Sequence, residues 1–211
     1  MKNILIVGAH FDDVELGAGG SAAKWVREGK KVYKLTLTDN VTNFAQYAIN
    51  VEYEKTMRES SECCKLIGMI EIKDFSPMPC NKLIYSTEIM QRVEKVIFEN
   101  NIDTIVIHYP YDANQDHVEA SKICLTAGRH CKNILFFKSN GYVSVPTFSP
   151  NYFVDISDFI ELKKQALNCY NGANNRFGRL FETCIENNHS FGYSNNVQFA
   201  EGFQLLKILE K

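Results

Sequence analysis

Short apolar segments rich in β-branched residues recur along the chain, separated by stretches with a different spacing. Segments of this kind, roughly four to eight residues long, predict buried strands. The strand-like segments cover residues 4–7, 32–38, 104–108, 134–137 and 152–156, with a weaker example over 70–75.

Between these segments, apolar residues fall at the three- and four-residue spacing of amphipathic helices. The predicted helices are one after the glycines at 17–20, where the chain is expected to turn tightly, and others over 53–67, 89–97, 118–125 and 159–170. The Asn- and Gly-rich residues 171–198 are expected to form a loop and a helix that wrap a site. Strands alternating with helices predict a Rossmann-like, doubly wound α/β fold: a mostly parallel sheet with helices on both faces, in one domain over residues 1–211.

Composition narrows the class of protein further. The chain has 211 residues, is 45% hydrophobic and carries a formal net charge of −2, so charge gives no reason to expect nucleic acid as a partner. It contains no apolar stretch near the roughly 18 residues that a membrane span needs, and no signal-peptide pattern. Its seven cysteines lack a C-x-x-C pair, which indicates reduced thiols in a cytoplasmic protein rather than a disulfide framework or a structural zinc site.

An imidazole and two carboxylates follow directly on the first predicted strand, at His10, Asp12 and Asp13. Negative charge at a strand end is costly unless a cation binds there, and His10 and Asp13 can converge on one ion from a single tight loop. Zinc favours nitrogen and oxygen ligands and leaves one position to water in catalytic sites. Other divalent ions also fit such a mixed ligand set.

The best candidate for a third ligand is His117, at the start of a helix after the strand over 104–108. Loops at the carboxyl ends of strands meet in one crevice of a doubly wound sheet, so the two motifs are expected to approach each other. Asp12, the second of two adjacent carboxylates that cannot easily both bind one ion, can then act as general base on a metal-bound water. Asp116 is expected to orient His117 or an acid group.

Structural alternatives exist for each of these residues. Asp12 and Asp13 also suit an N-cap pair for the following helix. His108 at a strand end is expected to be structural, and His130 and His189 to lie on the surface. A dinucleotide-binding opening is disfavoured, because two carboxylates stand where a pyrophosphate would bind and no G-x-G-x-x-G is present.

At these residues the chain resembles the LmbE / PIG-L family of zinc-dependent N-acetylglucosaminyl deacetylases. The family signature is Ala-His-Pro-Asp-Asp-x-Glu, and residues 9–15 match it except that Phe11 replaces proline. A second signature has an Asp-His pair where Asp116 and His117 stand. Residues 149–156 and 200–203 resemble later family segments, and residues 58–68 resemble a helix that carries a substrate-contacting arginine, here Arg58.

The resemblance implies that His10, Asp13 and His117 bind zinc, that Asp12 is the base and that Arg58 contacts the substrate. It also implies an N-acetylated sugar or sugar conjugate as substrate and leaves a homo-oligomer open. Many members carry His where Asn114 stands. An Asn amide donates to an oxyanion, a bond worth about 3 kcal/mol, but it supplies no proton to the leaving amine.

Three functions are compatible with these residues. The leading hypothesis is a cytoplasmic zinc hydrolase that removes an N-acetyl group from a sugar or sugar conjugate, with Asp12 and Asn114 acting on the reacting groups. The second is a metal-dependent hydrolase of another amide. The third is a degenerate member that binds metal or sugar without turnover.

Overall fold

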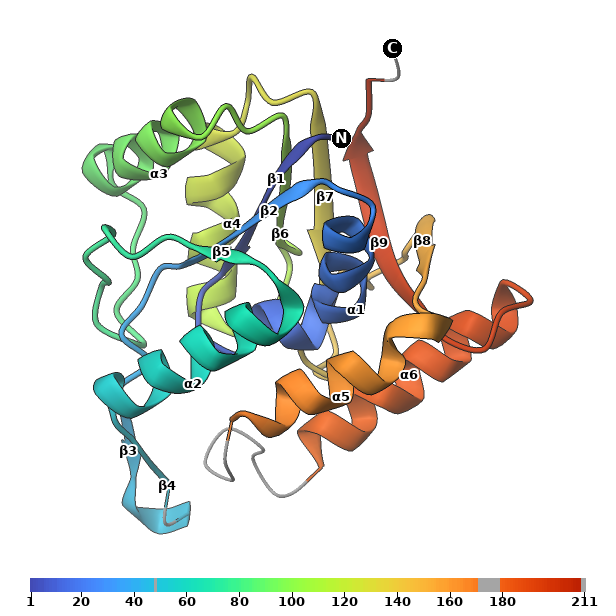
Figure 1. Cartoon of the computed structure of the whole chain (residues 1–211). Coiled ribbons are helices and arrows are strands. Elements are labelled where there is room, and N and C mark those ends of the chain that lie inside the picture. The colour runs from blue at the N-terminus through green and yellow to red at the C-terminus, as the bar shows by residue number, and fades with distance from the viewer. Residues whose placement is uncertain (48, 171–178, 210–211) are drawn as a thin grey trace.

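Seven strands form the main sheet in the computed structural model, which describes residues 1–47, 49–170 and 179–209 (Figure 1). Their order across the sheet is β5-β2-β1-β6-β7-β9-β8. The strands are β1 (Asn3–Gly8), β2 (Lys31–Thr36), β5 (Ile70–Glu71), β6 (Thr104–His108), β7 (Asn133–Phe137), β8 (Tyr152–Asp155) and β9 (Ala200–Lys207). A separate hairpin joins β3 (Thr42–Phe44) to β4 (Ile49–Val51).

The order in which successive strands are added changes sides at β1: the strands that follow β1 first lie on one side of it, and β6 lies on the other. β1 pairs in parallel with β2 on one side and with β6 on the other. β7 continues the parallel part beyond β6, whereas β9 runs antiparallel to both β7 and β8. In open α/β sheets, the crevice outside the carboxyl ends of two such diverging strands is the usual ligand site. The loops after β1 and β6 meet there.

Helices cover both faces of the sheet (Figure 1). On one face lie α1 (Asp13–Arg27), α2 (Tyr53–Ile67) and α5 (Ile160–Asn168), and on the other lie α3 (Thr87–Glu99) and α4 (Gln115–Ala127). The last helix, α6 (Leu180–Ser194), packs against β9 and α1. None of the helices in the described ranges is both long and apolar enough to cross a membrane.

Alternation along the central strands divides the core into two layers. In β1, Ile4 and Ile6 face the layer with α1, whereas Leu5 and Val7 face the layer with α3 and α4. Both sets are fully buried, as expected for a parallel strand covered on both sides. The predicted doubly wound α/β fold class is confirmed.

The glycines at 17–20 play a different part from the predicted turn. They lie inside α1, which begins at Asp13 and reaches them in its second turn. A Cβ atom on Gly17 would lie 2.0 Å from Cδ2 of Phe137, and one on Gly20 would lie 2.7 Å from Cδ1 of Ile156. These glycines therefore allow α1 to lie close to β7 and to the segment after β8. The prediction of a turn was wrong.

The strand β9 and the β3–β4 hairpin were not predicted. β9 contains a buried charge, Glu201, which conceals its apolar pattern. The Glu201 carboxylate accepts hydrogen bonds from the backbone N–H groups of Gly20 and Ser21 and pairs with the buried Lys163 ammonium at 2.5 Å. Glu201 thus joins the last strand to α1 and α5. Of the predicted segment over 171–198, residues 180–194 are helical, and residues 171–178 lie outside the described residues.

Candidate metal centre

The loop between β1 and α1 brings His10 and Asp13 together. The backbone N–H of His10 donates to Oδ2 of Asp13 at 2.7 Å, so the loop closes on itself as the helix begins. Gly8 permits this tight path, because a Cβ atom there would lie 2.6 Å from the carbonyl oxygen of His10. Asp12, at the helix N-cap position, forms no capping hydrogen bond with the described residues of α1. The alternative in which the Asp12 side chain caps the helix is therefore not observed.

Three potential ligand atoms converge at this loop. His10 Nδ1 lies 3.2 Å from His117 Nε2, and each nitrogen lies 3.3–3.4 Å from an oxygen of Asp13. All three side chains are buried. Corners of a tetrahedron with bonds of about 2.0–2.1 Å to its centre are roughly 3.3 Å apart, so the spacing fits a zinc ion. The residues present therefore fit the metal that the sequence predicts.

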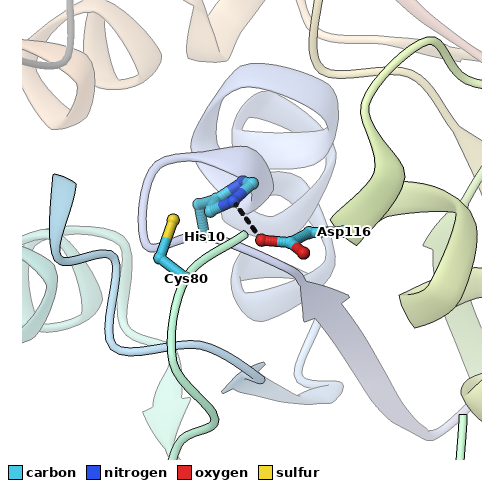
Figure 2. A group of neighbouring side chains, drawn as sticks. All are labelled: His10, Cys80 and Asp116. Atoms are coloured by element: carbon cyan, nitrogen blue, oxygen red, sulfur yellow. Dashed lines mark hydrogen bonds and ion pairs between the residues drawn. The ribbon is translucent and has the colours of Figure 1, made fainter. Parts of the chain in front are cut away.

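A carboxylate orients the first imidazole from behind. Oδ2 of Asp116 lies 3.2 Å from His10 Nε2, the ring nitrogen that does not face Asp13 (Figure 2). The backbone N–H groups of Asn81 and Leu83 donate to the same carboxylate at 2.6 and 3.3 Å. We expected Asp116 to orient His117 or an acid group, and it contacts His10 instead. Carboxylates in this position fix the tautomer and direction of metal-binding histidines.

Asp112 and Asn140 hold the second imidazole. Oδ2 of Asp112 lies 3.3 Å from His117 Nδ1, and Asn140 Nδ2 lies 3.3 Å from the same nitrogen. Asn140 also donates to both oxygens of Asp112 at 3.0 Å. Each imidazole of the centre thus has its own carboxylate partner. This arrangement leaves His10 Nδ1 and His117 Nε2 facing the same point.

His108 borders the centre without joining the converging triad. Its ring stacks on that of His117 with centroids 4.0 Å apart, and its Nε2 lies 3.1 Å from Oδ2 of Asp13. Burial and the nearby charge of His117 lower the pKa of His108 to about 4, so its ring is neutral at pH 7. The structural role predicted for His108 agrees with this position.

The charges of the centre favour a bound cation. Burial opposes the imidazolium form of His117, but Asp13 and Asp112 outweigh it and raise the pKa of His117 to about 9. Burial also opposes the charge on His10, and the hydrogen bond to Asp116 outweighs it and raises the pKa of His10. Desolvation alone would raise the pKa of Asp13, yet the neighbouring His117 and His108 hold it well below its usual range. The protons on the imidazoles of His10 and His117 thus balance the Asp13 carboxylate at the place where a metal ion would carry the positive charge.

A cavity of about 380 Å³ opens onto these side chains. Asp12 and Asn114 line it beside His10 and His117. Asn114 begins α4: its Oδ1 accepts the backbone N–H of Asp116 at 2.9 Å, which orients the amide and makes its Nδ2 the end available to a ligand. Besides the two imidazoles, Arg179 is the basic side chain among the described lining residues.

A second cavity of about 310 Å³ adjoins the first and shares Leu16, Asn140 and Thr183 with it. Most of its other lining groups come from α6 and from the segment between β7 and β8, with Asn187 and Ser144 among them. Asp and Glu are absent from the described lining of this second cavity.

Most of the predicted site residues lie together. His10, Asp12, Asp13, Asn114 and His117 line the first cavity, with Asp116 directly behind His10. Arg58 is exposed on α2 and is not among the described lining residues, so the structure does not bring it to the centre. His130 and His189 are exposed, as expected. The described cysteines, all seven, are free thiols.

Sequence reasoning missed four residues that contact the centre, namely Cys80, Asp112, Ser139 and Asn140. Ser139 donates to Oδ1 of Asp13 at 2.8 Å. Ser139 and Asn140 lie two and three residues beyond the end of β7, so the rule about carboxyl ends of strands would have found them. Cys80 lies near His10 and Asp116, from a segment outside any regular element, and no sequence signal indicates it (Figure 2).

Comparison with known proteins agrees with this geometry. The family profile described as PIG-L, GlcNAc-PI de-N-acetylase, matches residues 5–128. A diacetylchitobiose deacetylase from Thermococcus kodakarensis is 26% identical over 186 residues, which cover 79% of this chain and 68% of that protein.

Solved structures share the fold. The N,N'-diacetylchitobiose deacetylase from Pyrococcus horikoshii has a TM-score of 0.84 at 20% identity, over 97% of this chain and 84% of that one. The 4-carboxy-2-hydroxymuconate hydratase from Pseudomonas putida KT2440 has a TM-score of 0.82 at 17% identity, over 100% and 99%. The fold therefore carries more than one chemistry. The family profile covers more than half of the chain and includes all three converging residues, and the chain accordingly belongs to the PIG-L family of de-N-acetylases.

Proposed function

We propose that this protein is a zinc-dependent hydrolase that removes the N-acetyl group from a sugar or sugar conjugate. The observation that carries the proposal is the convergence of His10 Nδ1, His117 Nε2 and the Asp13 carboxylate within 3.2–3.4 Å of one another, at the floor of a cavity. A divalent ion held by these residues supplies Lewis acidity, which polarises an amide carbonyl and lowers the pKa of a water molecule to about 7.

Asp12 is the proposed general base. It lines the cavity beside His10 and Asp13 but is separate from the three converging atoms. A carboxylate at this place accepts a proton from the attacking water, and as an acid it returns that proton to the leaving nitrogen. One residue then performs both transfers, because Asn114 cannot donate a proton in the way that a protonated His would.

Asn114 is the proposed donor to the oxyanion. Its Oδ1 is engaged at the N-terminus of α4, and therefore its Nδ2 is the group directed to a ligand. A preorganised donor of this kind stabilises charge that develops on the amide oxygen and pays no reorganisation cost during the reaction. Asp116 and Asp112 would serve the same centre by keeping the two imidazoles in place.

The substrate proposal rests on the cavities and on the family. The second cavity combines apolar side chains with hydroxyl and amide groups, and the polar groups match the mixed donor and acceptor character of sugar hydroxyls. The first cavity would then hold the acetylated unit, and the second would hold what is attached to it. The relative from Thermococcus kodakarensis is named for a deacetylase reaction on a disaccharide, which supports an N-acetylated sugar as the first substrate to try.

The first experiment is a metal analysis of the purified, untagged protein beside a His117→Ala variant. About one zinc per chain, lost in the variant, is the expected result. Acetate release is then measured with N-acetylglucosamine and its conjugates. Asp12→Ala should retain the metal while kcat falls by about 10²–10⁴-fold. Full activity in Asp12→Ala would refute the mechanism.

The same assays separate the alternatives. Acetate release from other acylated amines, but not from N-acetyl sugars, would favour a hydrolase of another amide. Binding of metal and sugar with no acetate released from any substrate would favour a non-catalytic member of the family.

A further inference from the structure

The carbonyl oxygen of Phe11 is held by two buried donors. Lys34 Nζ lies 2.7 Å from it and the Tyr170 hydroxyl 2.6 Å. Phe11 stands between His10, a proposed metal ligand, and Asp12, the proposed base. We name the three side chains around this carbonyl, Glu15, Lys34 and Tyr170, the Phe11 clamp.

The hydrogen bonds of the clamp are fully matched. The three hydrogens of the Lys34 ammonium meet three acceptors: the Phe11 carbonyl, the Glu15 carboxylate at 2.8 Å and the Tyr170 oxygen at 2.9 Å. The Tyr170 hydroxyl is left to donate to the Phe11 carbonyl, with Glu15 Oε2 a second acceptor at 3.1 Å. A matched network of this kind permits one arrangement of its members and resists others.

Because the clamp is buried, its polar groups have no water to replace a lost hydrogen bond. Lys34, Glu15 and Tyr170 are each no more than 1% exposed. A buried ion pair contributes little net stability, because desolvation offsets the attraction between its charges, whereas loss of either partner is strongly destabilising. The clamp therefore serves better to fix geometry than to stabilise the fold. What it fixes is the peptide plane that joins Phe11 to Asp12.

The clamp also lies close to the proposed base. The carbonyl that Lys34 and Tyr170 hold belongs to the peptide group that leads directly into Asp12. The family signature has proline at position 11, and proline fixes φ through its ring. This chain has Phe11 there, and hydrogen bonds from distant segments restrain the same loop.

We propose that Lys34 and Tyr170, paired with Glu15, are positioning residues that set the direction of Asp12 by holding the Phe11 carbonyl. This inference rests on the proposed function, because it assigns a purpose to the position of Asp12. It predicts that the clamp affects kcat and leaves metal binding in place, since His10 and Asp13 have their own hydrogen bonds to Asp116 and Ser139.

The test uses Tyr170→Phe, which removes one hydroxyl and keeps the ring. The expected result is a fall in kcat of at least about tenfold, with KM and zinc content unchanged. Tyr109→Phe is the matched control: its hydroxyl also bonds backbone carbonyls, those of Pro146 and Thr147, and its loss should leave kcat within about twofold.

Hydrogen exchange of the amides over residues 9–13 gives a second readout that needs no turnover. Exchange should be faster in Tyr170→Phe and unchanged in Tyr109→Phe. Equal kcat in Tyr170→Phe and wild type, or a fall in kcat that is accompanied by loss of zinc, would overturn the proposal. A wild-type protein with no activity refutes the proposed function instead, and unchanged exchange in Tyr170→Phe then refutes the clamp separately.

Discussion

Asp116 holds His10 by the nitrogen that points away from the converging triad. Its Oδ2 lies 3.2 Å from His10 Nε2, while His10 Nδ1 faces Asp13 and His117. The pair is buried, and two backbone N–H groups fix the carboxylate from the other side. The tautomer with its proton on Nε2 is thereby favoured, which frees Nδ1 as a ligand.

Replacing Asp116 by Asn should weaken zinc binding by about 10–100-fold, because the carboxylate no longer strengthens and orients the His10 ligand. The dissociation constant is measured by competition with a chelator of known affinity. Glu119→Gln is the matched control on the same helix, since its carboxylate accepts the backbone N–H of Tyr85 and has no contact with His10 among the described residues. Equal affinities for all three proteins would contradict this role.

Asn114→Asp should separate the two tasks of Asn114. Asp also caps helices well, so the melting temperature should stay near that of the wild type. The amide donor is lost, and kcat should fall by about 10²–10³-fold. Asn114→Ala loses both tasks and should in addition lose about 1 kcal/mol of stability. Kinetics and thermal unfolding of the two variants test this, and wild-type kcat in Asn114→Asp would exclude an oxyanion role.

The metal-free protein should lose stability as the pH rises from about 6.5 to about 9. Asp13 and Asp112 overcome burial and raise the pKa of His117 from 6.5 to about 9. A raised folded-state pKa gives stability that is complete below the unfolded-state pKa and is lost as pH passes the folded-state value. His117 accounts for at most about 3 kcal/mol of this loss, and His10, whose pKa is also raised, adds to it in the same direction.

Urea unfolding at pH 6.5 and pH 9, with His117→Gln as the control, measures this loss. The lowered pKa of His108, about 4, affects stability only below pH 6.5 and does not disturb this window. A slope that persists unchanged in His117→Gln would assign it to other groups.

Gly17→Ala should destabilise the protein by about 1–3 kcal/mol, because the added methyl would lie 2.0 Å from the ring of Phe137. Gly19→Ala is the control in the same helix: its nearest neighbours, Glu15 and Lys163, lie 3.7 Å away. Alanine favours helix over glycine, so Gly19→Ala should stabilise by up to about 1 kcal/mol. Thermal unfolding distinguishes the two, and equal effects would refute the close approach of α1 to β7.

The converging triad could be predicted because its residue types stand in or just after the loops that follow two strands. His10 and Asp13 follow β1, and His117 follows the loop after β6, so the topology of a parallel sheet brings them together. The same rule brings Asn140, after β7, to this end of the sheet, but it does not indicate which imidazole or carboxylate Asn140 contacts. Asp112 and Asn140 meet at His117 only because the segment after β7 returns over the loop after β6, and local sequence does not encode that path.

Two features of the fold misled local reasoning for physical reasons. Glycine usually indicates a turn, but at Gly17 and Gly20 it provides space for neighbouring side chains within a helix. A charged residue usually argues against a buried strand, but Glu201 is neutralised by Lys163 and satisfied by backbone N–H groups of α1. In both cases tertiary contacts outweigh the local preference.

The position of β9 between β7 and β8 bears on how the chain is made. A ribosome releases β7 and β8 well before β9, and β8 joins the sheet through β9. Until then β7 has an open edge of the kind that promotes association with other chains. The helix that carries the metal loop also waits, because Glu201 is the acceptor for Gly20 and Ser21. The segment of a nascent chain that carries His10 and Asp13 therefore gains its last contacts late, although it is synthesised first.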